Sequence, residues 1–214
     1  MSRPERLVVV LGTGTEVGKT WVSCRLLELL RSDGVRVAAR KPAQSFDPPG
    51  PGSAPPTDAD VLAAASGEPP GEVCPPHRSY ALALAPPMAA ARLGQPAIRL
   101  DSLVAELRWP NGVGVGLVET AGGVRSPLAD DADGAALAHR VAADLAVLVA
   151  DAGLGTVHAV RSSAPALAPL PLVVVLNRFD ERDPLHRDNR EWLSQRDGFD
   201  VVTDVADVAA RLSR

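Results

Sequence analysis

Nine residues decide the fold of this chain: Gly12-Thr13-Gly14-Thr15-Glu16-Val17-Gly18-Lys19-Thr20. They follow a short apolar run, Leu7–Leu11, and precede a segment whose leucines recur at helical spacing. A strand, a glycine-rich turn and a helix that begins at Gly-Lys-Thr together form a phosphate-binding loop. Glycines let the backbone approach phosphate oxygens, and the first amides of the helix attract the anion. The sequence therefore predicts a nucleotide-binding protein.

Two side chains of this loop carry its chemistry. Lys19 adds a charge that can reach the terminal phosphates, and the Thr20 hydroxyl can hold Mg2+. The usual pattern has glycine where this chain has Thr13, and Gly12 lies one residue earlier, so the loop is a variant one residue longer. Of the 22 basic residues, only Lys19 and Lys41 are lysine. Because a compact ammonium and a planar guanidinium are not interchangeable, both lysines are predicted to serve the chemistry.

Length and charge restrict the class of protein. The 214 residues suit one domain, 1–214, with a sizeable core. A net charge of −4 argues against nucleic acid or an anionic membrane as the main partner. The apolar runs are too short to span a bilayer, and the N-terminus has no signal-peptide pattern. Two isolated cysteines, Cys24 and Cys74, indicate reduced thiols, so we expect a cytoplasmic protein.

Short apolar runs alternate with helical patterns along the chain. The runs lack polar alternation, as is typical of strands covered on both faces. They are Leu7–Leu11, Val35–Ala39, Val115–Val118, Leu145–Ala150, Leu172–Leu176 and, more weakly, Phe199–Val202. The helical patterns are Thr20–Ser32, Asp58–Ala65, Ser102–Leu107, Gly134–Ala143, Asp188–Arg196 and Asp207–Leu212. This alternation predicts an α/β protein with a doubly wound, mostly parallel sheet flanked by helices, the P-loop NTPase fold.

Two segments rich in proline interrupt this pattern. Residues 47–56 are predicted to form an exposed, mobile loop, which is either a flap over the site or a plain surface loop. The segment Glu68–Pro76 is predicted to be a second loop without obvious chemistry.

Polar residues follow the predicted strands, where ligands bind in an open parallel sheet. Lys41 follows the second strand, and Glu119 ends the third. Glu119 is either a solvated strand end or a carboxylate that reaches the Mg2+ held by Thr20, and the metal role is preferred. Asn177, after a later strand, offers a donor and an acceptor that suit the edge of a nucleobase.

Further candidates lie on the segment that leaves Lys41. Ser45, four residues beyond Lys41, can hydrogen-bond an acid group. Asp58 and Asp60 open a predicted helix, where a carboxylate either supports the metal or caps the helix. For Asp60 the capping role is preferred.

These motifs together resemble the dethiobiotin synthetase family. The matching stretches, in that family's order, are GTGTEVGKT, Lys41-Pro42 with Ser45, Glu119-x-Ala-Gly-Gly, Gly153-Leu154-Gly155-Thr156 and Asn177-Arg178, and they span residues 7 to about 180. The resemblance implies a homodimeric enzyme that uses CO2 or bicarbonate, Mg-ATP and 7,8-diaminopelargonic acid, a diamino acid, to make dethiobiotin for biotin synthesis. It also implies that a carbamate forms first, that ATP phosphorylates it, and that the second amine then displaces phosphate.

The resemblance also implies roles for individual residues. Catalysis falls to Lys41, Lys19 and Thr15, substrate binding to Thr15, Lys41 and Ser45, and Mg2+ binding to Thr20, Asp58 and Glu119. ATP binding falls to Glu16, Val17, Gly18, Lys19, Thr20, Trp21, Asp58, Glu119, Gly122, Asn177 and Arg178. We expect Lys41 to act as an electrostatic clamp, because phosphorylating a carbamate brings anionic oxygens together.

The chain departs from the family pattern at three places that bear on function, and one of them is Phe199–Asp204, which lacks the proline of a Gly-x-x-Pro turn that the family often has near the base. Thr120 stands where the family has glycine, and Val157 precedes His158 where the family has leucine or isoleucine and then asparagine. Two alternatives therefore stay open beside the synthetase. One is a related ATP-dependent ligase acting on another amine or acid, and the other is a nucleotide-binding regulator without synthetase activity.

Overall fold

The computed structural model describes residues 3–48, 50 and 55–213. Six strands form a single parallel sheet in the order β10-β9-β8-β1-β5-β2. In chain order they are β1 (Arg6–Gly12), β2 (Val37–Arg40), β5 (Val115–Gly123), β8 (Leu145–Asp151), β9 (Leu172–Asn177) and β10 (Val201–Val202). Each strand was predicted within a few residues, and the parallel order confirms the doubly wound fold.

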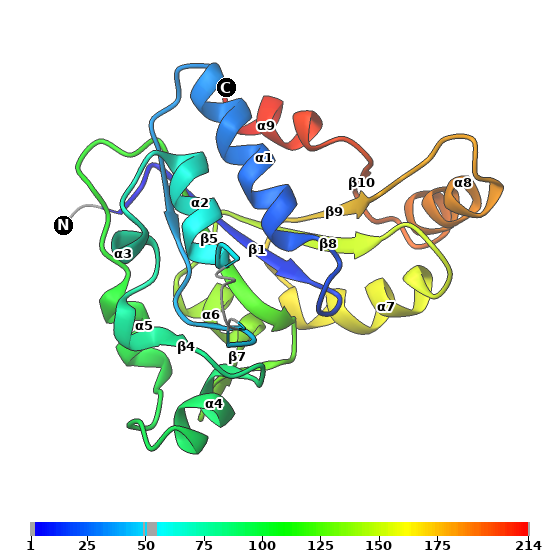
Figure 1. Cartoon of the computed structure of the whole chain (residues 1–214). Coiled ribbons are helices and arrows are strands. Elements are labelled where there is room, and N and C mark those ends of the chain that lie inside the picture. Colours follow the sequence, from blue (N-terminus) through cyan, green and yellow to red (C-terminus); the bar gives the residue numbers. More distant parts are fainter. Residues whose placement is uncertain (1–2, 49, 51–54, 214) are drawn as a thin grey trace.

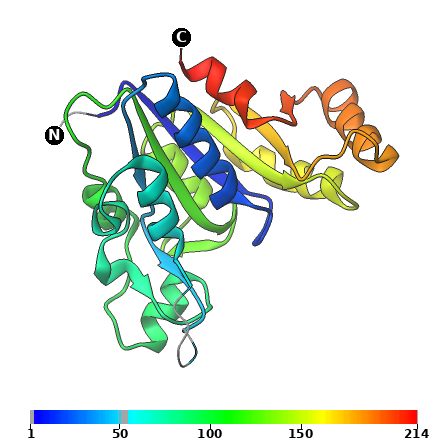
Figure 2. The same cartoon turned by 45° about the horizontal axis from the view of Figure 1, so that its top comes forward.

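Helices cover both faces of this sheet (Figure 1). One face packs against α1 (Lys19–Ser32), α2 (Asp58–Ser66) and α9 (Val205–Leu212), with Val8 and Val10 of β1 pointing into that core. The other face packs against α6 (Gly134–Arg140) and α7 (Thr156–Ser163), with Leu7, Val9 and Leu11 pointing the opposite way. Figure 2 shows α1 and α2 side by side across the sheet. The alternation of β1 between two buried faces explains its continuous apolar run.

The remaining elements are short. They are the strand pairs β3 (Gln44–Ser45) with β4 (Ser79–Tyr80) and β6 (Pro127–Ala129) with β7 (Ala132–Asp133), the helices α3 (Pro70–Val73), α4 (Pro86–Arg92), α5 (Leu100–Glu106) and α8 (Pro184–Glu191), the 3-10 turns Pro76–Arg78 and Ala164–Leu167, and a π-helical turn, Trp192–Arg196. Helices α4 and α8 lie at opposite ends of the molecule (Figures 1 and 2).

Several local predictions need correction. The predicted helix Asp188–Arg196 begins at Pro184 instead, because Asp183 caps it through the amide of Leu185, and it continues into the π-helical turn. The predicted loop Glu68–Pro76 contains helix α3, and Glu68 pairs with the buried Arg40 at 2.9 Å. The predicted mobile loop falls largely on residues 49 and 51–54, which lie outside the described residues.

The register brings the polar strand ends together at one edge of the sheet. Val10 of β1 is level with Glu119 of β5, and Asp151 of β8 is level with Asn177 of β9. Residues that are far apart in the sequence therefore meet at the carboxyl ends of the strands, beside the loop that joins β1 to α1.

Candidate functional site

The loop between β1 and α1 presents unoccupied backbone amides. Gly18 precedes α1 with a left-handed φ of 90°, and the first turn of the helix has neither a side-chain cap nor an acidic residue. A Cβ atom on Gly18 would lie 2.0 Å from Nδ2 of Asn177, so only glycine fits there. The helix start is thus left open for an anion.

Lys19 lies along this loop, and its Nζ donates one hydrogen bond within the described part of the chain, to the carbonyl oxygen of Gly14 at 3.1 Å. Burial and the nearby charge of Lys41 lower the pKa of Lys19 below the ordinary lysine value, although Glu119 and Asp58 oppose the change. An anionic ligand on the loop would relieve that penalty, because it favours the charged form.

Lys41, just after β2, forms the centre of a buried ionic cluster. Its Nζ lies 2.6 Å from Oδ2 of Asp58 and 2.6 Å from Oε1 of Glu119, and Glu119 is fully buried. Burial alone would lower the pKa of Lys41, but the two carboxylates outweigh it, so the pKa lies above the ordinary lysine value. Lys41 therefore stays protonated at any physiological pH.

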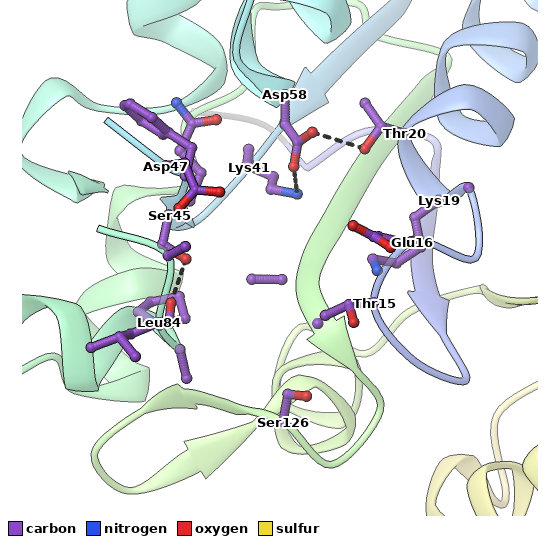
Figure 3. Close-up of a pocket in the computed structure, with 18 of the residues that line it drawn as sticks. Thr15, Glu16, Lys19, Thr20, Lys41, Ser45, Asp47, Asp58, Leu84 and Ser126 are labelled. Carbon is purple, nitrogen blue, oxygen red and sulfur yellow. Dashed lines mark hydrogen bonds and ion pairs between the residues drawn. The ribbon is translucent and has the colours of Figure 1, made fainter. Parts of the chain in front are cut away.

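Thr20 joins the same cluster from the phosphate-binding loop. Its hydroxyl lies 3.1 Å from Oδ1 of Asp58 and 2.9 Å from Oε1 of Glu119 (Figure 3 shows the bond to Asp58). Asp58 is also free of the capping role, because Thr57 caps α2 and forms a reciprocal capping box with Asp60. The capping prediction for Asp60 is confirmed. One hydroxyl and two carboxylates from three separate elements thus converge, an oxygen set that suits Mg2+ held together with phosphate oxygens.

The sequence prediction missed one member of this cluster, Ser23. The Ser23 hydroxyl is fully buried on α1 and donates to Oε2 of Glu119 at 2.6 Å. Together with the bonds from Lys41 and Thr20 it leaves both oxygens of Glu119 occupied. The one sequence signal for this role is that Ser23 lies one helical turn after Lys19, on the same face of α1.

A cavity of about 890 Å3 opens in front of the cluster (Figure 3). Its charged and polar wall includes Lys19, Lys41 and Asp58, and its apolar wall is formed by Phe46 and the backbone around Leu84. Thr15, Glu16, Ser45, Gly122 and Arg178 also line it. The Ser45 hydroxyl donates to the carbonyl oxygen of Leu84 at 2.5 Å, which fixes one side of the cavity.

Thr120, which departs from the family pattern, does not line this cavity. It is fully buried, and its hydroxyl lies 3.4 Å from the carbonyl oxygen of Val10 inside the sheet. The Thr120 side chain therefore packs inside the sheet, and the neighbouring Ala121 and Gly122 line the cavity.

A second cavity of about 440 Å3 lies on the other side of Gly18 and Arg178. Trp21, Asn177 and Phe179 line it. Asn177 also holds the phosphate-binding loop, because its Nδ2 donates to the carbonyl oxygen of Val17 at 2.9 Å.

Arg178 links the loop to the neighbouring strand end. Its guanidinium donates to the carbonyl oxygen of Glu16 at 2.9 Å and to Asp151 at 2.8 Å. Glu16 and Arg178 both have a left-handed φ, of 60° and 58°. The hydrogen bond between them fixes the phosphate-binding loop against the end of β9 in a backbone conformation that non-glycine residues rarely adopt.

The residues predicted for the site border one of the two cavities or the ionic cluster between β2, β5 and α1, with the exception of Val17, which lines neither cavity and contacts Asn177 through its carbonyl oxygen. Among the residues that the structure describes, no helix is long and apolar enough to cross a membrane.

Comparison with known proteins is consistent with this geometry. Residues 6–209 match a family model described as an AAA domain. A protein of Anaeromyxobacter sp. (strain Fw109-5) named ATP-dependent dethiobiotin synthetase BioD is 38% identical over 218 residues, covering 96% of this chain and 93% of that protein. A protein of the same name from Caulobacter vibrioides (strain NA1000 / CB15N) is 44% identical over 152 residues, covering 69% of this chain and 67% of its own length.

Solved structures resemble the fold at much lower identity. A plasmid partition protein from Borrelia burgdorferi superposes with a TM-score of 0.58 at 12% identity, covering 99% of this chain and 97% of that chain. The signal recognition particle receptor FtsY from Elizabethkingia anophelis gives 0.52 at 15% identity, covering 100% and 67%. These likenesses establish the nucleotide-binding fold alone. The sequence relatives go further, and this chain belongs to the ATP-dependent dethiobiotin synthetase family.

Proposed function

We propose that this chain joins CO2 to 7,8-diaminopelargonic acid and closes the ureido ring of dethiobiotin at the expense of ATP, a step of biotin synthesis. The observation that carries the proposal is the buried ammonium of Lys41, 2.6 Å from both Asp58 and Glu119, at the wall of the cavity that the phosphate-binding loop also borders. A nucleotide switch needs the loop but has no use for a second buried cation facing the same cavity.

The reaction proceeds in three balanced steps. One amine attacks CO2, a C–N bond forms, and a proton leaves to give the carbamate. A carbamate oxygen then attacks the γ-phosphorus, ADP leaves, and a carbamic–phosphoric anhydride results. Finally the second amine attacks the carbonyl carbon, phosphate leaves, the nitrogen loses a proton to the phosphate or to water, and the ring closes. Holding the diamine in one orientation makes this last step effectively intramolecular.

The two lysines serve the phosphoryl transfer. An anionic carbamate must approach an anionic γ-phosphate, and the ammonium groups of Lys41 and Lys19 offset that repulsion. The raised pKa of Lys41 keeps it charged, so it acts as a clamp and not as a general base. Thr15 and Ser45 line the same cavity and are the hydroxyls that would donate to the carbamate, Ser45 by exchanging its present bond to the carbonyl oxygen of Leu84.

Mg2+ fits the oxygen donors of Thr20, Asp58 and Glu119. When bound with ATP, the ion neutralises charge on the phosphates. The residues from Glu16 to Trp21 would hold the phosphates and the adjoining part of ATP. Gly122, which lines the larger cavity, Asn177, which lines the smaller one, and Arg178, which lines both, would also contact the nucleotide.

We further propose that the enzyme is a cytoplasmic homodimer. Leu154, at the turn before α7, is 92% exposed. A single exposed leucine is ordinary on a protein surface, so the dimer is proposed from the resemblance to the family and not from this side chain. Light scattering of the purified chain tests the dimer, and a monomer at micromolar concentration would rule it out.

The function is tested by phosphate release from Mg-ATP and bicarbonate with and without the diamine, together with mass spectrometry of the product. Diamine-dependent phosphate release with equimolar dethiobiotin is expected. Nucleotide binding without diamine-dependent turnover would contradict the proposal and favour a regulator. Turnover only with another amine or acid would favour a related ligase, in line with Val157.

A further inference from the structure

The buried side chain of Gln44 connects the two segments that carry Lys41 and Asp58. Gln44 lies in β3, shortly after Lys41, and is 4% exposed. Its Oε1 accepts a hydrogen bond from the backbone amide of Ala59 at 2.9 Å. Ala59 directly follows Asp58 at the start of α2. One carboxamide therefore ties the segment that leaves Lys41 to the residue beside Asp58.

The orientation of this carboxamide is fixed by its partners. A backbone amide only donates, so the atom that faces Ala59 is the oxygen, and Nε2 faces the remaining partners. Nε2 lies 2.8 Å from Oγ of Ser79 and 3.3 Å from Oγ1 of Thr57. The backbone of Gln44 is also paired with that of Ser79 where β3 meets β4. Side chain and backbone thus hold Gln44 in one place, against β4 and the first turn of α2.

Asp58 depends on such an anchor more than Glu119 does. Glu119 is fully buried within β5, whereas the Asp58 side chain is 45% exposed and borders the cavity. The aspartate side chain is short, so the position of its carboxylate follows the position of the helix start. Thr57 and Gln44 accept hydrogen bonds from amides of that helix start, which leaves the Asp58 carboxylate to the ionic cluster.

We propose that Gln44 is a positioning residue for Asp58 as a ligand of Mg2+, an inference that rests on the proposed Mg-ATP-dependent function. It holds the start of α2, where Oδ1 of Asp58 lies 3.1 Å from the Thr20 hydroxyl and Oδ2 lies 2.6 Å from Nζ of Lys41. The Gln44 carboxamide is itself engaged with the protein, so it acts through Asp58 and not on the substrate. Partners that orient a metal ligand in this way set the affinity of the site for the metal. Without Gln44 the phosphate-binding loop keeps its amides, but Mg2+ contributes less to nucleotide binding.

Nucleotide binding with and without Mg2+ tests this role in the full chain. Gln44→Met keeps the length of the side chain but removes both of its hydrogen-bonding atoms. The effect of Mg2+ is the ratio of the ATP dissociation constant in EDTA to that in Mg2+, measured by calorimetry. In Gln44→Met this ratio is expected to fall by about 10-fold or more relative to the wild type. The dissociation constant in EDTA should stay at the wild-type value, because the loop that holds the phosphates is unchanged.

Two further variants separate positioning from the stability of α2. Thr57→Ala removes the cap of this helix through Asp60. It leaves the bonds of Gln44 to Ser79 and Ala59, so it should lower the thermal midpoint but keep the wild-type effect of Mg2+. Ser79→Ala removes only the 2.8 Å partner of Nε2 and should reduce the effect of Mg2+ less than Gln44→Met does.

The outcomes of these measurements are distinct from the test of dethiobiotin synthesis. A wild-type effect of Mg2+ in Gln44→Met, or an equal loss in Thr57→Ala, would overturn the inference. If Gln44→Met does not fold, an unchanged effect of Mg2+ in Ser79→Ala would overturn it instead. If Gln44→Met loses the effect of Mg2+ and the wild type makes no dethiobiotin, the inference stands and the proposed function fails. If dethiobiotin is made and Gln44→Met binds Mg-ATP as the wild type does, the function stands and the inference fails.

Discussion

The two lysines of this chain border one cavity from opposite regions with opposite surroundings. Lys41, at the end of β2, is held between two carboxylates at 2.6 Å, and its pKa is raised. Lys19, on the phosphate-binding loop, has one backbone partner at 3.1 Å, and burial together with Lys41 lowers its pKa. The protein's own carboxylates therefore form ion pairs with Lys41, whereas the Lys19 ammonium donates to a backbone carbonyl oxygen.

This difference assigns different tasks to the two side chains. A charge already fixed by its neighbours stabilises developing negative charge without reorganising, as expected of a preorganised clamp. A charge such as that of Lys19, which forms no ion pair with the residues that the structure describes, is stabilised most by an arriving phosphate, as expected of a ligand-binding group. The same type of residue thus orients the chemistry in one region and captures the substrate in the other.

Replacing Lys41 by arginine is expected to lower turnover more than any other variant considered for the two lysine sites. The charge is kept, but a planar guanidinium cannot place one nitrogen between Asp58 and Glu119 in a site sized for an ammonium. We expect kcat for dethiobiotin formation to fall by at least about 100-fold. The control is Arg25→Lys on the exposed face of α1, paired with Glu28 only at 3.8 Å, which should leave kcat unchanged. Near-normal turnover of Lys41→Arg would refute the clamp.

Removing the buried carboxylate is expected to have the next largest effect. Glu119→Gln leaves one carbonyl oxygen for three donors, from Lys41, Thr20 and Ser23, so at least one buried donor loses its acceptor. We expect a loss of about 2 kcal/mol or more in the free energy of unfolding and a fall in turnover of about 10-fold or more. Urea unfolding and steady-state assays measure the two effects.

The matched comparison is Asp58→Asn, since Asp58 also contacts Lys41 and Thr20 but its side chain is 45% exposed. Its effect on stability should be smaller, because water replaces the lost contact. Equal destabilisation by the two variants would show that burial does not distinguish the two carboxylates.

The strands and the loop could be predicted because their signals are local. The β1 strand is apolar throughout, and Gly18-Lys19-Thr20 is contiguous. Helices α4 and α7 were not predicted, because α4 is an alanine-rich segment that opens with two prolines and α7 has few apolar positions. Propensity alone does not identify such short helices, which tertiary packing stabilises.

The individual site residues could be predicted only where a strand end exposed them. Lys41 and Glu119 were found this way, and the structure brings them together. Ser23 could not be found, because its partner lies 96 residues later and its own neighbours look like any buried turn of a helix. The pairing of Glu68 with Arg40 was missed for the same reason, since the two are 28 residues apart.

The pH dependence of kcat/KM should distinguish the two lysines. A lowered pKa means that Lys19 loses its proton before an ordinary lysine, so kcat/KM for ATP should fall as pH rises, with a midpoint below 10.5. Above that midpoint the fall approaches about tenfold per pH unit. Lys41 causes no fall in kcat/KM at alkaline pH, because its pKa in the folded protein is raised and it stays charged throughout this range.

At acidic pH, the free energy of unfolding depends instead on the ionic cluster around Lys41. The pKa of Asp58 is lowered, chiefly because Lys41 outweighs the effect of burial, so its contribution to stability is complete above the unfolded value of about 3.9. That contribution is lost as pH falls through the lower folded pKa. Asp58→Asn should therefore flatten stability against pH below about 4, and an unchanged profile would contradict the pairing.

The smallest effect on turnover is expected from Ser23→Ala. The variant removes the bond to Oε2 of Glu119 but leaves Lys41 and Thr20, which line the cavity, on Oε1. A buried hydrogen bond to a charged group contributes about 1.5–3 kcal/mol, and stability should fall by that amount while turnover changes by less than about 5-fold. Ser32→Ala, on the exposed end of the same helix, should change neither. If Ser23→Ala lowered turnover as much as Glu119→Gln, the orientation of Glu119 would be set from α1, and the fixed character of the Lys41 site would depend on the helix that follows the phosphate-binding loop.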